Sequence, residues 1–124
     1  MNVVDSSGWL EYFANDSNAD FFAPAIERVS ALVVPSVSIY EVFKRVIQQR
    51  GEGDALQAVT LMMQGLVVDL GVTISLSAAR ISIQFNLPMA DSIMLATARD
   101  YNATLWTQDA DFKAIPGVRY IAKK

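Results

Sequence analysis

The stretch LPMADSIMLATARDYNATLWTQDADF, from Leu87 to Phe112, carries the pattern that decides the fold. Apolar side chains recur at helical spacing in its first half, and a compact apolar run follows the turn residue Asn102. Two carboxylates flank these segments: Asp91 lies where the helix begins, and Asp109 lies just past the apolar run. The stretch therefore predicts a helix from residues 89–91 to 101, a strand over residues 104–107 and an acidic loop over residues 108–112.

The rest of the chain repeats this alternation of short apolar strands with longer helical segments. Such alternation is typical of a parallel sheet that is covered by helices on both faces. We therefore expect a compact single-domain α/β/α sandwich over residues 1–124, with a central, mostly parallel sheet. The other expected strands cover residues 2–4, 31–34, 66–69 and 118–121; the other expected helices cover residues 9–13, 19–28, 36–50, 54–63 and a segment from Ser75 or Ser77 to Phe85.

Four acidic residues fall at related places in this pattern. Asp5 follows the first strand and Asp109 follows the fourth, so both lie at the ligand-binding edge of the sheet if these two strands are neighbours. Glu41 lies in the first turn of the helix after the second strand, on the same side. Asp91 opens the helix before the fourth strand, and a crossover helix antiparallel to the strands has that end near the same edge. The pattern predicts that the four carboxylates meet in one crevice.

Each of these acids also has a purely structural interpretation. Asp5 can cap the helix that follows it, and Glu41 together with Ser38 fits the capping pattern S-x-x-E. Asp91 lies in the first turn of its helix, where the helix dipole favours a negative charge. Both interpretations stay open at the level of the sequence.

The composition limits the chemistry of such a crevice. The 124 residues include no cysteine and no histidine, which excludes disulfides, thiolate ligands and imidazole catalysis. Carboxylates in one crevice repel each other, at a cost of roughly 3 kcal/mol for each pair about 5 Å apart in an effective dielectric near 20. A bound cation would relieve this repulsion, and ligands that are all oxygen suit Mg²⁺ or Mn²⁺ rather than zinc.

Charge and patterning also narrow the class of protein. The formal net charge of −3 counts against a passive nucleic-acid-binding module, which is usually basic, and less against a nuclease whose acids are neutralised by bound cations. Lys44, Arg45 and Arg50 either contact phosphates or form a solvated helix face. The first ten residues lack the positive segment of a signal peptide, and no apolar run is long enough to span a bilayer. Together with the absence of cysteine, this leads us to expect a cytoplasmic protein.

The ordered set of acids inside this α/β pattern resembles the PIN-domain family, and within it the VapC-type ribonuclease toxins of type II toxin–antitoxin systems. The similarity extends over almost the whole chain, and the order and spacing of the matching segments make it specific. Those segments are VVDSS with Asp5, SIYEVFKR with Glu41, LPMADSIMLATA with Asp91 and TQDADF with Asp109.

The resemblance implies a sheet of about five parallel strands and a divalent-metal-dependent endoribonuclease that cleaves RNA with metal-activated water. It also implies a cognate antitoxin that blocks the site. Ser7 and Thr107 match polar positions that would orient the acids, and Asp111 is either a peripheral member of the site or a turn cap. Carried over residue by residue, the resemblance assigns the catalytic site and its Mg²⁺ or Mn²⁺ to Asp5, Glu41, Asp91 and Asp109.

Other classes of protein group acids in a similar way. A phosphoacceptor domain of the response-regulator type would need an acidic pair after the first strand, and a haloacid-dehalogenase-like phosphatase would need D-x-D there. In this chain Asp5 is followed by two serines. A non-catalytic interaction domain with a degenerate site is a third alternative, and the complete set of four acids argues against it.

The helical segments between Val42 and Met63 carry more apolar side chains than one small sheet face needs. We interpret these side chains as core or as a partner surface rather than as a cofactor site. We therefore expect part of this surface to be buried in a homodimer, under an antitoxin segment, or in both.

Overall fold

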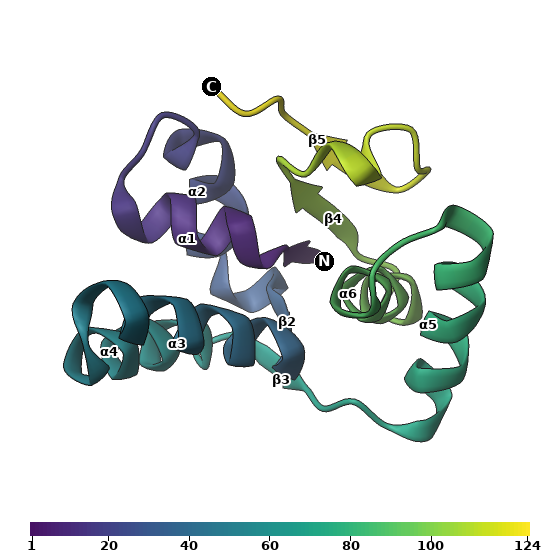
Figure 1. Cartoon of the computed structure of the whole chain (residues 1–124), viewed down its shortest axis with the longest axis horizontal. Helices are drawn as coiled ribbons and strands as arrows, with labels where there is room; N and C mark the ends of the chain where they lie inside the picture. The colour runs from purple at the N-terminus through teal and green to yellow at the C-terminus, as the bar shows by residue number, and fades with distance from the viewer.

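The computed structural model describes residues 1–124 as five short strands and six α-helices arranged around a central sheet (Figure 1). The strands are β1 (Asn2–Val4), β2 (Val33–Pro35), β3 (Leu66–Val68), β4 (Thr104–Thr107) and β5 (Val118–Tyr120). The helices are α1 (Ser6–Ala14), α2 (Ala19–Glu27), α3 (Ser36–Arg50), α4 (Glu52–Met62), α5 (Val72–Phe85) and α6 (Met89–Asp100). Two short 3-10 turns, η1 (Val29–Ala31) and η2 (Ala110–Phe112), complete the elements.

The strands are all parallel to their neighbours and follow the spatial order β3-β2-β1-β4-β5. Strands β1, β4 and β5 form one hydrogen-bonded ladder, and β2 and β3 form a second. A single parallel bridge between Asn2 and Leu32 joins the two ladders. The predicted parallel sheet is confirmed, but its backbone hydrogen bonding is interrupted at a seam between β1 and β2.

The two faces of the sheet support two separate cores, because successive side chains of a strand point to opposite faces. Val3 belongs to a core with α5 and α6, whereas its neighbour Val4 belongs to a core with α1, α2, α3 and α4. The same division separates Leu105 from Trp106 on β4. Helices therefore cover both faces, as the sequence predicts, and each fully buried aliphatic side chain contributes roughly 1.5–3 kcal/mol.

Helix α1 begins at Ser6, three residues before the predicted start at Trp9. The reason is local: Asp5 Oδ1 accepts a hydrogen bond from the Gly8 N–H at 2.8 Å and caps the helix at once. A Cβ atom at Gly8 would lie 2.6 Å from Phe22 Cε1 and 2.7 Å from Val4 Cγ1. Only glycine allows this approach of α1 to the sheet, so Gly8 keeps its N–H within reach of Asp5.

Several other predicted boundaries were wrong by one to five residues. Helix α5 begins at Val72 after Gly71, and Ser75 does not cap it but donates to the Gly71 carbonyl at 2.7 Å, as serines inside helices do. The turn η1 takes up residue 31, so β2 begins at Val33. No helix combines the length and the apolar character that crossing a lipid bilayer would require.

Candidate metal centre

The strand order reverses between β1 and β4, because the chain builds the sheet outward from β1 through β2 and β3 and then adds β4 and β5 on the other side. Crevices at such a switch point, beyond the carboxyl ends of the strands, are where open α/β sheets bind ligands. The register pairs Val4 with Trp106. Asp5 and Asp109 therefore leave neighbouring strands at the same edge, as the sequence predicts for adjacent first and fourth strands.

Asp5 is held rigidly and is almost completely buried, with 3% of its surface exposed. Its Oδ1 accepts from the Gly8 N–H at 2.8 Å and from Ser7 Oγ at 2.9 Å. Its Oδ2 accepts from Thr107 Oγ1, so Ser7 and Thr107 both contact the acid that the resemblance assigns to them. Burial raises the pKa of the Asp5 carboxyl to about 6, although these hydrogen bonds lower it. The capping interpretation of Asp5 is correct, and it does not exclude a role at the switch point.

Thr107 links two of the acids. Besides donating to Asp5, its Oγ1 accepts a hydrogen bond from the Asp109 N–H at 2.9 Å. A hydroxyl has one proton to donate and two lone pairs to accept with, so one buried threonine can fix both carboxylates relative to each other.

Glu41 does not form the capping box that its spacing suggests. Pro35 occupies the cap position of α3 and makes no side-chain capping bond, so Ser38 lies inside the helix and its buried Oγ has no hydrogen-bond partner. The Glu41 carboxylate instead accepts from Ser6 Oγ at 2.7 Å, across the seam between the two ladders. This bond turns Glu41 toward the carboxyl end of β1.

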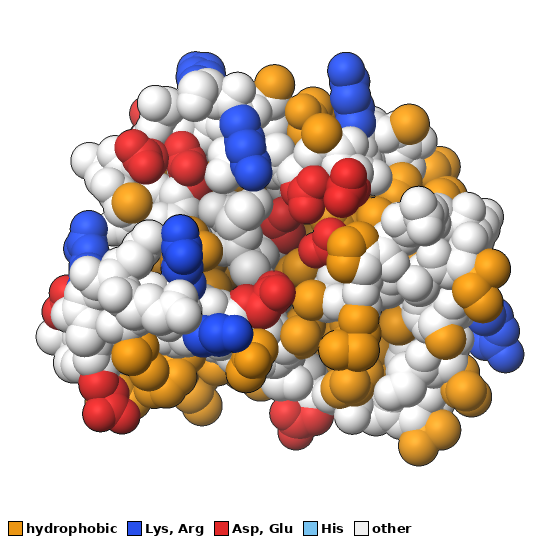
Figure 2. Space-filling view, viewed as in Figure 1, with side chains coloured by type: hydrophobic (Ala, Val, Ile, Leu, Met, Phe, Trp, Pro, Cys, Tyr) orange, Lys and Arg blue, Asp and Glu red, His pale blue; other side chains and the backbone are white.

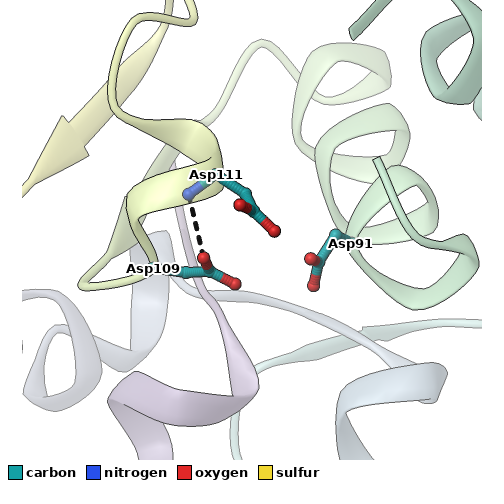
Figure 3. Close-up of side chains that lie close together, drawn as sticks. All are labelled: Asp91, Asp109 and Asp111. Atoms are coloured by element: carbon teal, nitrogen blue, oxygen red, sulfur yellow. Dashed lines mark hydrogen bonds between the residues drawn. The ribbon is translucent and has the colours of Figure 1, made fainter. Parts of the chain in front are cut away.

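Three further aspartate side chains come together from α6 and from the loop after β4. Figure 3 shows Asp91, Asp109 and Asp111 with their carboxylates turned toward one another. One oxygen from each of the three side chains lies within 4.8 Å of the others, and the Asp111 N–H donates to Asp109 Oδ1 at 2.9 Å. Asp111 is exposed and does not line the acidic pocket, so it lies at the rim of the cluster, and its N–H also closes the turn.

The acids predicted from the sequence line one pocket of about 390 Å³. Its other lining residues include Ser7, Leu10 and Arg45. Figure 2 shows the acidic side chains gathered in a hollow at the middle of this face. The four acids of this pocket, which come from four different segments of the chain, are Asp5, Glu41, Asp91 and Asp109.

The electrostatics of the pocket favour a bound cation. Partial burial, together with the negative charges of the neighbouring acids, raises the pKa of the Asp91 carboxyl to about 7. Every charged ligand that the pocket offers is a carboxylate, which suits a hard divalent cation. In order of their effect on Asp91, the neighbouring acids are Asp109, Asp5, Glu41 and Asp111.

Sequence reasoning missed Ser6 and Gln108, which position the acids. Ser6 holds Glu41, and the buried Gln108 donates to Glu11 Oε1 at 3.2 Å and accepts from Asn18 Nδ2 at 2.9 Å. Through these bonds the Asp109 loop is tied to α1 and to the turn before α2. Serine and glutamine are common in solvated loops, so their residue type gave no signal. The only signal in the sequence was that Ser6 directly follows Asp5 and Gln108 directly precedes Asp109.

The stability of the metal-free protein is expected to fall as the pH rises from about 4 to about 7. The pKa of Asp5 is raised from 3.8 to about 6 and that of Asp91 from 3.8 to about 7. Between these values the folded state binds more protons than the unfolded state, so stability is lost with increasing pH. Thermal melts in EDTA at pH 5 and pH 7.5 measure the effect, with Asp91→Asn as the variant that should show a shallower dependence. A wild-type melting temperature that rises more steeply with pH than that of Asp91→Asn would contradict the expectation.

Fold and site together define a class of protein: a small α/β domain with an acidic, carboxylate-only pocket at the switch point of a parallel sheet. The PIN domain model matches residues 3–118. The chain therefore belongs to the PIN domain family. A comparison with curated protein sequences found no match.

Solved structures with the same fold come from several bacteria. A chain of a toxin–antitoxin complex from Klebsiella pneumoniae is 20% identical with a TM-score of 0.81, over 96% of both chains. The sarcin–ricin loop cleaving toxin VapC20 of Mycobacterium tuberculosis is 16% identical with a TM-score of 0.77, over 94% of this chain and 95% of that one. A chain of VapBC2 from Rickettsia felis, bound to a promoter DNA fragment, is 14% identical with a TM-score of 0.73, over 98% and 97% of the two chains. At these identities the likeness establishes the fold.

Proposed function

We propose that this protein is a divalent-metal-dependent endoribonuclease and the toxin of a VapC-type toxin–antitoxin pair. The observation that carries the proposal is the convergence of four carboxylates from separate segments in one pocket of a PIN domain. Structural neighbours include a toxin that cleaves the sarcin–ricin loop. An RNA phosphodiester is the substrate class that best fits this acidic pocket once a cation offsets its charge.

Each acid has a distinct part in the proposal. Asp91 and Asp109 would bind the cation directly, because their oxygens converge with that of Asp111. Asp5, whose oxygens are already held by donors, would fix the position of the metal from below. Glu41 would accept a proton or orient water from the opposite wall of the pocket. Mg²⁺ or Mn²⁺, when bound, would lower the pKa of water and offset negative charge on the phosphate.

The alternatives from the sequence fit the pocket less well. A haloacid-dehalogenase-like phosphatase would need an accessible oxygen on the aspartate after the first strand, whereas Asp5 is 3% exposed and hydrogen-bonded at both oxygens. A response-regulator domain would need an acidic pair there, whereas Ser6 and Ser7 follow Asp5. No lysine lines the pocket. A non-catalytic domain would not need the raised pKa values that burial and the clustered acids give Asp5 and Asp91.

Incubation of the purified protein with total bacterial RNA in Mg²⁺ or Mn²⁺, followed by sequencing of new 5′ ends, tests the proposal. The expected result is a small set of discrete cleavage sites that are absent with Asp91→Asn. Cleavage that is equal for the two proteins would show a contaminating nuclease and would leave the proposal without support. Brief expression in a host, with the same readout, tests the toxin role.

A cognate antitoxin is part of the proposal. Toxin–antitoxin complexes from Klebsiella pneumoniae, Rickettsia felis and Salmonella typhimurium contain chains with this fold. A free ribonuclease of this kind would damage its own host, so a protein that covers the acidic pocket is required for growth. Co-expression with the product of an adjacent gene should restore growth and yield a stable complex.

We also expect the purified chain to form a homodimer through the surface of α3 and α4. Four apolar side chains are exposed on or beside these helices: Ile47, Leu56, Leu61 and Met63. They belong to the segment in which the sequence predicts more apolar side chains than the core needs. Light scattering should give twice the mass of one chain, and Leu56→Glu combined with Leu61→Glu should give the monomer. Leu76→Glu, which changes an exposed leucine on α5, is the matched control and should leave the dimer intact. A monomeric wild-type protein at micromolar concentration would refute the expectation.

A further inference from the structure

Arg45 lies at the junction of two hollows. It lines the acidic pocket, and it also lines a side groove of about 250 Å³ between α1 and α3. We use the name side groove for the depression bounded by Leu10, Glu11, Asp16, Arg45, Gln49 and Gln108. Ser7, Leu10 and Arg45 belong to both hollows, so the side groove continues the acidic pocket. An RNA strand that enters the acidic pocket can therefore extend directly into the side groove.

The guanidinium of Arg45 is available to an external anion. Arg45 follows Glu41 by four residues on α3, which places both side chains on one face of the helix. Glu41 nevertheless takes its side-chain hydrogen bond from Ser6, and Arg45 is exposed. It is the one cationic residue that lines either hollow. Figure 2 shows lysine and arginine side chains over α3, beside the central acidic hollow.

The side groove itself suits a nucleobase better than a phosphate. Its lining outside the acidic pocket includes the carboxylates of Glu11 and Asp16 and the amide of Gln49. Glu11 already accepts from Gln108 Nε2 and from the Asn18 N–H, which leaves Asp16 and Gln49 to pair with a base. Carboxylates repel phosphates but accept hydrogen bonds from the amino groups of bases. Leu10 adds an apolar wall against which a base can pack. The groove is smaller than the roughly 300–1,000 Å³ of pockets for drug-sized ligands, so it has room for one nucleotide.

We propose that Arg45 binds the phosphate next to the one that is cleaved, and that the side groove receives the base of that nucleotide from single-stranded RNA. The inference rests on the proposed ribonuclease function and assigns Arg45 as a positioning residue. Unpaired RNA is required, because a base can enter the groove only when it is unstacked. A planar guanidinium can donate two hydrogen bonds to one phosphate, which would fix the strand relative to the acids.

Equilibrium binding without turnover tests this role. A fluorescently labelled single-stranded RNA is titrated with the wild-type protein and with Arg45→Gln in Ca²⁺, a hard cation that takes oxygen ligands and replaces the Mg²⁺ or Mn²⁺ that turnover requires. We expect Arg45→Gln to raise Kd about tenfold and to reduce the slope of log K against log salt by about 0.7, the value for one phosphate contact on a single strand. Arg45→Lys should restore the salt slope but only part of the affinity. Arg50→Gln, which removes the same charge from the same helix outside both hollows, should change Kd less than twofold.

The outcomes separate this inference from the proposed function. An unchanged Kd and salt slope for Arg45→Gln would overturn the role of Arg45, even if the wild-type protein cleaves RNA. An equal loss of affinity for Arg45→Gln and Arg50→Gln would overturn it as well, because it would reflect net charge alone. Absence of cleavage by the wild-type protein, with the expected changes in binding, would refute the nuclease and leave the contact in place. Thermal melts of each variant verify that the exposed substitutions leave the fold intact.

Discussion

Asp91→Asn is expected to abolish RNA cleavage and, in the absence of metal, to raise the melting temperature. Asp91 contributes an oxygen to the group with Asp109 and Asp111, so its loss should reduce the cleavage rate by at least about a hundredfold, as the loss of one electrostatic stabiliser does. Burial and neighbouring charges raise the pKa of Asp91 to about 7. The charged form is therefore disfavoured in the metal-free fold, and a neutral amide relieves that cost.

Two effects on stability oppose each other at this position. A carboxylate in the first turn of α6 gains about 0.3–1 kcal/mol from the helix dipole, which the amide gives up. The raised pKa means that repulsion and burial outweigh this gain. After allowance for solvent screening at a half-exposed group, we expect a net gain of about 1 kcal/mol, or about 4 °C in melting temperature.

Asp69→Asn is the matched control for this prediction. Asp69 directly follows β3 at the same edge of the sheet and is exposed, so its replacement should change neither cleavage nor stability. If Asp91→Asn folds and cleaves RNA at the wild-type rate, the nuclease proposal fails. If it cleaves poorly but melts several degrees lower, the carboxylate serves the helix and the fold rather than a cation.

Removal of divalent metal is expected to eliminate cleavage completely and to lower stability. The chain has no histidine and no cysteine, so no imidazole or thiol can take over proton transfer or nucleophilic attack. Mg²⁺ or Mn²⁺ at a hundred times its Kd should add about 2.7 kcal/mol to the free energy of unfolding, or about 10 °C in melting temperature. Asp91→Asn should lose most of this increase.

The measurement is a pair of titrations on one sample. Cleavage of a labelled RNA and the melting temperature are followed while EDTA is added and Mg²⁺ is then restored in excess. The cleavage rate and the melting temperature should both fall as EDTA is added and recover together when Mg²⁺ is restored. Zinc should not be needed for this recovery. Cleavage that persists after thorough chelation would overturn the mechanism, whereas an unchanged melting temperature with lost cleavage would place the metal on the RNA rather than on the protein.

The two apolar faces of the strands and the shared edge of Asp5 and Asp109 follow from simple features of the sequence. Val3 and Val4 alternate between two cores because a strand between helical layers must be apolar on both faces. Asp5 and Asp109 come together because both follow parallel strands, and the register of β1 with β4 places their exits side by side. Rules on chain direction place both aspartates at one edge of the sheet, but only the structure shows that β1 and β4 are neighbours.

What the sequence did not reveal depends on contacts between distant residues. The pattern around Ser38 and Glu41 satisfies a capping box, but α3 begins at Ser36 with Pro35 at the cap position, and Glu41 accepts a hydrogen bond from Ser6 instead. The approach of Asp111 to Asp91 and Asp109 depends on the tight turn η2, in which its N–H donates to Asp109. Asn18 and Gln108 are 90 residues apart in the chain, and no local signal pairs them.

The seam between β1 and β2 gives the acidic pocket an uneven stiffness. Asp5 and Asp109 leave one continuous ladder, where backbone pairing fixes their separation. Glu41 belongs to the segment that follows the other ladder, and its side chain reaches across the seam through one hydrogen bond from Ser6. The pocket is therefore rigid between the two aspartates and compliant toward the glutamate. Displacement of Glu41 should therefore cost less free energy than a change in the separation of Asp5 and Asp109.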